Sequence, residues 1–124
     1  MPAKYLLDST VIIDHFNGIK QATEWIAGLT PGEALISVVT RAEVLAKAGD
    51  NWEAIVVFLD EYACLPIGPD EADIAAGLRS RYRVKLADAF QAALAQGEGL
   101  VVITRDEADF KKIADLEVKL PYKL

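Results

Sequence analysis

The chain has 124 residues, of which 52% are hydrophobic, as expected for one domain with a single core. Nineteen acidic and thirteen basic residues give a net charge of −6, which excludes nucleic-acid binding by bulk charge alone. One cysteine and one histidine exclude an internal disulfide and a zinc site built from several thiolates or imidazoles. Any metal must therefore be held by oxygen. Without a signal peptide or an apolar run long enough to span a membrane, we expect a cytoplasmic protein.

The first half of the chain predicts two buried strands, each followed by helices. Tyr5, Leu6 and Leu7 are apolar without alternation, as in a strand covered on both faces, and they lead directly into Asp8. Thr40 and Glu43 have the spacing of a capping box, which predicts a helix that begins at Thr40. The other elements expected in this half are a strand over 34–39 and helices over 11–16, 19–29 and 51–62.

The second half continues the alternation of strands and helices. An Ala-rich helix carries Asp88 in its first turn, and Gly97 is expected to end it. Cys64 lies in an apolar stretch and is expected to be buried. The expected elements are strands over 64–67 and 100–103, helices from 69 and over 86–96, and an edge strand from 117. This order predicts a three-layer α/β domain, with a mostly parallel sheet of four or five strands between helices.

Four acidic residues stand where such a sheet would gather them. Asp8, Glu43, Asp88 and Asp106 are all expected at helix amino termini, three of them after strand ends, and parallel strands end at one shared edge. Each acid alone could be a helix cap. Together they would repel one another unless a divalent cation bound, and Mg²⁺ prefers carboxylate oxygens shared with substrate phosphates. The cluster therefore predicts a magnesium site for phosphodiester chemistry.

Four segments carry the motifs around these acids. They are the apolar strand ending in Asp8-Ser9-Thr10, Ser37-Val38-Val39-Thr40 leading to Ala42-Glu43-Val44, Leu86-Ala87-Asp88-Ala89 with Ala92-Ala93, and Thr104-Arg105-Asp106-Glu107-Ala108-Asp109-Phe110. Together they resemble the PIN-domain ribonucleases, especially the VapC-type toxins of bacterial and archaeal toxin–antitoxin pairs, over nearly the whole chain. The chain departs from the family's usual residues at Ser9-Thr10 and at Ala87, where proline is common. The resemblance implies one PIN-like nuclease domain over residues 1–124.

The resemblance also implies a site and partners. The residues that it assigns to catalysis and to one or two Mg²⁺ or Mn²⁺ ions are Asp8, Glu43, Asp88 and Asp106, with Asp109 as an added or substitute ligand. The hydroxyls that it places around these ligands are those of Ser9, Thr10 and Thr104. The implied activity is metal-dependent endoribonuclease cleavage, which would leave 5′-phosphate and 3′-hydroxyl ends. The implied partners are RNA, a small cognate antitoxin and a second copy of the chain.

A basic run ends three residues before Asp88. Its members are Arg79, Arg81, Arg83 and Lys85. They could simply complement the negative end of a helix dipole. Because an acidic chain that binds a polyanion needs a local basic patch, we also predict that they grip RNA phosphates, and we assign Arg105 to the same role.

Two other classes of function fit part of the pattern. A PIN-like module could bind RNA without cleaving it, but that would be favoured by an incomplete set of acids, and this set is complete. A phosphoacceptor signalling domain has similar size and fold class, yet it requires an acceptor Asp after a central strand. Gly68-Pro69 follows the predicted strand over 64–67, so we predict an endoribonuclease.

Overall fold

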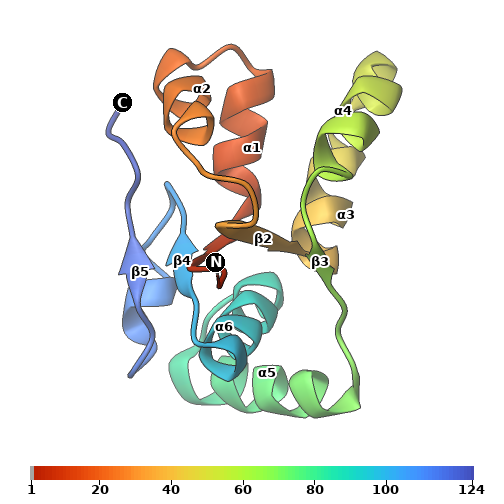
Figure 1. The fold of residues 1–124 in the computed structure, drawn as a ribbon. Coiled ribbons are helices and arrows are strands. Elements are labelled where there is room, and N and C mark those ends of the chain that lie inside the picture. The colour runs from red at the N-terminus through yellow and green to blue at the C-terminus, as the bar shows by residue number, and fades with distance from the viewer. Residues whose placement is uncertain (1) are drawn as a thin grey trace.

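The apolar strands assemble into one five-stranded sheet in the order β3-β2-β1-β4-β5, and every neighbouring pair is parallel. The computed structural model describes residues 2–124 (Figure 1). The strands are β1 (Tyr5–Leu7), β2 (Ala34–Ser37), β3 (Cys64–Leu65), β4 (Val101–Ile103) and β5 (Val118–Lys119). β1 and β4 are far apart in the sequence but pair in parallel, so the residues that follow them lie side by side.

Helices cover both faces of this sheet. Those of residues 2–124 are α1 (Ser9–Phe16), α2 (Lys20–Ala27), α3 (Val38–Ala46), α4 (Trp52–Leu59), α5 (Pro69–Tyr82) and α6 (Leu86–Glu98), with short 3₁₀ helices η1 (Gly49–Asn51) and η2 (Phe110–Lys112). Figure 1 shows α1 to α4 on one side of the sheet and α5 and α6 on the other. The predicted three-layer α/β fold is confirmed.

The core follows the twofold alternation of a strand. Leu7 points to the α1–α4 face, where it packs with Ile12 and Ile36, whereas Leu6 points to the α6 face and packs with Leu94. Both leucines are fully buried. A strand buried on both faces has no need of polar alternation, which explains the unbroken apolar character of β1.

Several local expectations differ from the structure. The Ser37 side chain accepts a hydrogen bond from the Thr40 backbone N–H, so α3 begins at Val38 and the predicted Thr40–Glu43 capping box is wrong. β2 correspondingly ends at Ser37. The helix expected to stop at Gly97 continues to Glu98, because Gly99 adopts the left-handed conformation (φ 67°) that ends α6.

Cys64 is exposed rather than buried, because it lies in a two-residue strand at the edge of the sheet. Within residues 2–124, no helix combines the length and the apolar character that crossing a bilayer requires.

Candidate active site

The four acids selected from the sequence line one pocket beside the carboxyl ends of the central strands. Asp8 follows β1 directly, Glu43 comes from α3 after β2, Asp88 lies in the first turn of α6, and Asp106 follows β4. The pocket has a volume of about 230 Å³. Its lining residues are Asp8, Ser9, Thr10, Ile13, Glu43, Lys47, Lys85, Ala87, Asp88 and Asp106.

Only part of the expected helix placement holds. Asp8 occupies the cap position of α1, and Asp88 lies in the first turn of α6. Glu43 instead lies within α3, and Asp106 lies in the loop between β4 and η2. The expectation that all four acids start helices is therefore wrong, and their common feature is the pocket.

The Asp8 side chain does not cap its helix. It is 5% exposed and makes no capping hydrogen bond to α1. Its Oδ2 accepts hydrogen bonds from the hydroxyls of Thr104 (2.8 Å) and Thr10 (3.2 Å). Thr104 also accepts a hydrogen bond from the Asp106 backbone N–H at 3.0 Å, so its hydroxyl connects the segments that carry Asp8 and Asp106.

Burial and mutual repulsion act on the pocket carboxyls. Burial, and then the charge of Asp8, raises the pKa of Glu43, although a hydrogen bond with Ser9 opposes the rise. Burial, followed by the charges of Asp8 and Asp109, raises the pKa of Asp88 to about 7. A bound divalent cation would offset the repulsion between these carboxylates and so favour their ionised forms.

Asp109 contacts the start of α6 and shares a side-chain hydrogen bond with Asp88. Its carboxylate accepts a hydrogen bond from the Lys85 backbone N–H (3.0 Å), at the start of α6, and one from Lys112 Nζ (3.1 Å). The Lys85 backbone bond is the main cause of the lowered pKa of Asp109. Asp109 is outside the lining of the pocket as formed by residues 2–124. It fixes the start of the helix that carries Asp88.

The donor set fits a hard divalent cation, because the pocket offers carboxylates and hydroxyls without thiolates or imidazoles. Among residues 2–124, no three Asp, Glu, His or Cys side chains are already arranged to hold an ion. Binding would thus draw the carboxylates inward or use bridging waters, which Mg²⁺ commonly retains.

Two lysines lie among the acids. Lys85 belongs to the predicted basic run, whereas Lys47 is not among the site residues predicted from the sequence. The positive charges of both lysines lower the pKa of Glu43, against the effect of its burial. Lys47 follows Glu43 by one helical turn, and that spacing on one helix face was a usable signal.

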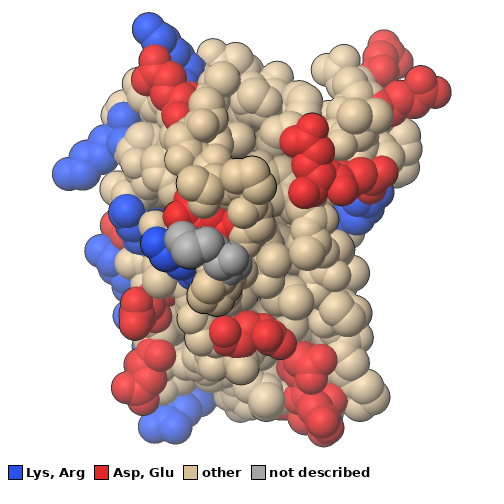
Figure 2. All heavy atoms as spheres, in the orientation of Figure 1, with Lys and Arg blue, Asp and Glu red and all other residues tan. Residues whose placement is uncertain are grey.

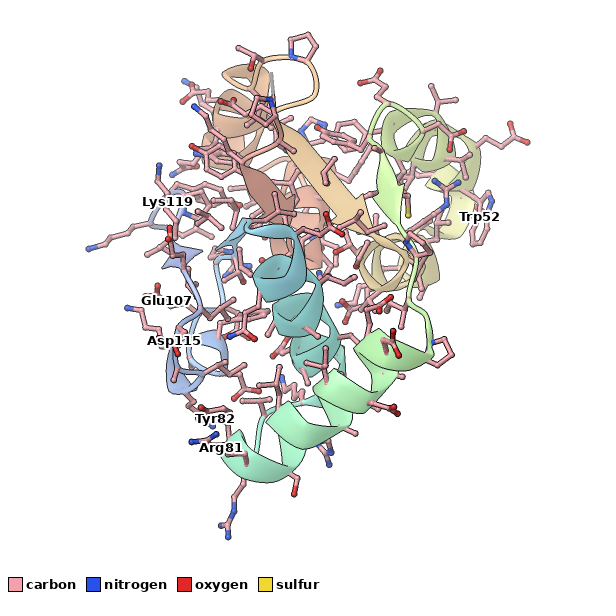
Figure 3. The ribbon with its side chains drawn as sticks, turned by 60° about the horizontal axis from the view of Figure 1, so that its bottom comes forward. Trp52, Arg81, Tyr82, Glu107, Asp115 and Lys119 are labelled. Atoms are coloured by element: carbon pink, nitrogen blue, oxygen red, sulfur yellow. The ribbon has the colours of Figure 1, made fainter. Side chains whose placement is uncertain are left out.

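The arginines of the basic run are not among the pocket-lining residues of the described chain. Arg79 donates a hydrogen bond to the Val84 carbonyl (2.8 Å), and Arg83 ends α5 in the left-handed conformation. The Arg81 guanidinium lies over the Tyr82 ring, 5.3 Å from its centroid. Figure 3 shows this pair at the end of α5. These arginines therefore have contacts that shape and terminate a helix.

Arg105 makes a two-pronged ion pair within the fold. Its guanidinium donates to both oxygens of Asp14, which is 4% exposed, and Tyr122 donates to the same carboxylate at 2.8 Å. The Arg105 backbone N–H donates to the Thr10 hydroxyl (3.1 Å). These bonds tie the loop before Asp106 to α1 and to the carboxyl-terminal tail.

Comparison with known proteins agrees with this architecture. A family model described as PIN domain matches residues 5–116. The chain therefore belongs to the PIN-domain family, and the resemblance inferred from its motifs is confirmed. No curated protein sequence matches the chain significantly.

Several solved structures share the fold over nearly the full length. A toxin–antitoxin complex from Klebsiella pneumoniae contains a chain 31% identical to this one, with a TM-score of 0.86, over 98% of this chain and 100% of that one. FitAcB from Neisseria gonorrhoeae is 26% identical, with a TM-score of 0.81, over 97% and 99% of the two chains. DNA-bound VapBC from Salmonella typhimurium, at 22% identity and a TM-score of 0.80 over 94% and 97%, shares the fold.

Proposed function

We propose that this PIN-domain protein is a cytoplasmic, metal-dependent endoribonuclease of the VapC toxin type. It would hydrolyse RNA phosphodiester bonds to 5′-phosphate and 3′-hydroxyl ends. The proposal rests on one observation: Asp8, Glu43, Asp88 and Asp106 come from separate parts of the chain and line the same pocket. Carboxylates crowded in this way, with a raised pKa at Asp88, suit a site whose charge is completed by cations.

These four carboxylates would hold the Mg²⁺ or Mn²⁺. A bound divalent ion supplies a water of lowered pKa and offsets negative charge on the phosphate. Thr104 and Thr10 orient the Asp8 carboxylate toward this task through their hydroxyls. His15 is not a pocket residue: its Nδ1 lies 2.8 Å from the Thr23 hydroxyl, and its ring stacks on Phe58.

Lys47 and Lys85 are the residues that we propose to hold RNA phosphates beside the carboxylates. Both line the pocket, and a chain of net charge −6 needs local cations to bind a polyanion. On the face shown in Figure 2, Lys and Arg lie mainly on the side of β5, and most of the remaining described surface is uncharged or acidic. Lys47 and Lys85 would supply positive charge beside the pocket carboxylates.

Cleavage of a defined RNA by the purified protein tests the proposal. With Mg²⁺ or Mn²⁺, we expect new fragments that carry 5′-phosphate and 3′-hydroxyl ends, since a water of lowered pKa, rather than the ribose hydroxyl, would attack the phosphorus. Excess chelator should stop the reaction. Products with 2′,3′-cyclic phosphates, or undiminished cleavage in chelator, would rule out this mechanism. RNA binding without cleavage would favour the inactive PIN-like module.

We further propose a small antitoxin as the inhibitor and a homodimer as the working form. The antitoxin is supported by the similarity to a chain from a toxin–antitoxin complex. A groove of about 450 Å³ between α2 and α4, lined in part by Ile26, Leu29, Phe58 and Tyr62, offers apolar surface for its attachment. Co-expression with the product of an adjoining small gene should give a stable complex, which tests the antitoxin. The homodimer is tested separately: a free chain that stays monomeric at high concentration would contradict it.

A further inference from the structure

Three polar side chains are buried in the core between the elements that carry the acids. Ser37, Thr40 and Gln91 are at most 1% exposed. Ser37 Oγ donates to Gln91 Oε1 at 2.5 Å, and Gln91 Nε2 donates to Thr40 Oγ1 at 2.6 Å. Thr40 Oγ1 in turn donates to the Leu7 carbonyl at 2.9 Å. We call these three side chains the Gln91 network.

Two side chains of this network lie within one helical turn of a pocket acid. Gln91 follows Asp88 by three residues on α6, and Thr40 precedes Glu43 by three residues on α3. Residues at this spacing share one face of a helix. Leu7, whose carbonyl accepts the last hydrogen bond, is the residue before Asp8. One chain of hydrogen bonds thus connects the backbone positions of three of the four acids.

Apolar packing alone would hold α6 less firmly in place. Its buried face consists largely of alanines, among them Ala89, Ala92, Ala93 and Ala95. Small side chains form shallow ridges, so they do little to fix the rotation or sliding of one helix against another. Hydrogen bonds are directional, and the Gln91 amide satisfies donor and acceptor at once. The network supplies the orientation that the alanines do not.

We infer that Ser37, Thr40 and Gln91 are positioning residues that hold Asp8, Glu43 and Asp88 at the separation needed for a shared divalent cation. The inference rests on the proposed function. The carboxylates repel one another in the metal-free protein, and this network opposes their spreading apart. Residues that hydrogen-bond directly to metal ligands commonly change metal affinity by roughly 10- to 100-fold when they are replaced, and this network, which acts through the backbone, is expected at the lower end of that range.

A matched pair of variants at Thr40 tests the inference. Thr40→Val preserves the shape of the side chain but removes the hydroxyl that bonds Gln91 and Leu7. Thr40→Ser keeps that hydroxyl and loses only a methyl group. We expect Mn²⁺ affinity, measured by titration with electron paramagnetic resonance, to fall about tenfold or more in Thr40→Val and to be largely kept in Thr40→Ser. In Thr40→Val, kcat should fall while KM for RNA changes little.

Thr40→Val leaves the Gln91 amide unpaired in the core, so it also lowers stability. The double variant Thr40→Val/Gln91→Met removes that amide and is expected to unfold at a higher temperature than Thr40→Val. Its Mn²⁺ affinity should nevertheless stay low. Recovery of Mn²⁺ affinity together with stability in the double variant would overturn the inference, as would wild-type affinity in folded Thr40→Val.

The wild-type chain separates this outcome from failure of the proposed function. If the wild type binds Mn²⁺ and cleaves RNA while Thr40→Val and the double variant match it, only the positioning role is refuted. If the wild type neither binds Mn²⁺ nor cleaves RNA, the proposed function is refuted, and the positioning role is refuted with it.

Discussion

Replacing Asp8 by Asn is expected to reduce RNA cleavage by about a thousandfold or more, because a metal ion supplies several kcal/mol of transition-state stabilisation. Asn keeps an oxygen that can accept the Thr104 hydrogen bond, and it caps helices about as well as Asp. It lacks the negative charge that would hold an ion. Initial rates of fragment formation at saturating Mg²⁺ measure the effect.

The fold of Asp8→Asn should survive. In the metal-free protein, the variant loses one of the charges that raise the pKa of Asp88 and Glu43, so its unfolding temperature should equal or exceed that of the wild type. Asp73→Asn, on the exposed surface of α5, is the matched control and should cleave normally. Wild-type activity in Asp8→Asn would leave Asp8 with only a structural role.

Replacing Lys47 and Lys85 together by Met is expected to weaken RNA binding roughly tenfold or more, and to make the salt dependence shallower by roughly one unit for each lost phosphate contact. Met retains an unbranched apolar stem but carries no charge. Both lysines lower the pKa of Glu43, so their loss also raises that pKa further. Binding should therefore be measured with an RNA that the enzyme cannot cleave, at saturating Mn²⁺ and over a series of salt concentrations.

The control is the double variant Arg81→Met/Arg83→Met. It removes the same amount of charge from the basic run, but from residues outside the pocket lining. We expect the arginine pair to weaken RNA binding less than the lysine pair. A larger loss in the arginine variant would mean that the RNA follows the end of α5, as the basic run in the sequence suggests.

The clustering of the four acids in one pocket could be predicted because each acid lies beside a local sequence pattern. Asp8 and Asp106 follow short apolar strands, and Asp88 opens an Ala-rich helix, so a parallel sheet brings them to one edge. Glu43 was selected by its motif, but its helix was misplaced. Ser37 and Thr40 both suit a cap, and only the fold shows that Ser37 accepts the bond.

The supporting residues were harder to predict because their partners lie far away in the sequence. Arg105 is predicted to bind RNA, a role that stays a prediction, and its ion pair with Asp14, 91 positions earlier, had no signal near either residue. Gln91 could have been noticed only as one amide among the alanines of a buried helix. Its partners Ser37 and Thr40 follow from the packing of α6 on α3, which the sequence pattern does not specify.

Binding of Mn²⁺ is the measurement that tests the central claim most directly. Titration of the wild type at about pH 8, above the pKa of about 7 at Asp88, should show saturable binding. At about pH 6, the proton on Asp88 competes with the ion, so the affinity should fall. Asp8→Asn should lose the binding, and Asp73→Asn should retain it. Absence of saturable binding in the wild type at the higher pH, or equal binding in Asp8→Asn, would contradict a metal-dependent nuclease site in this pocket.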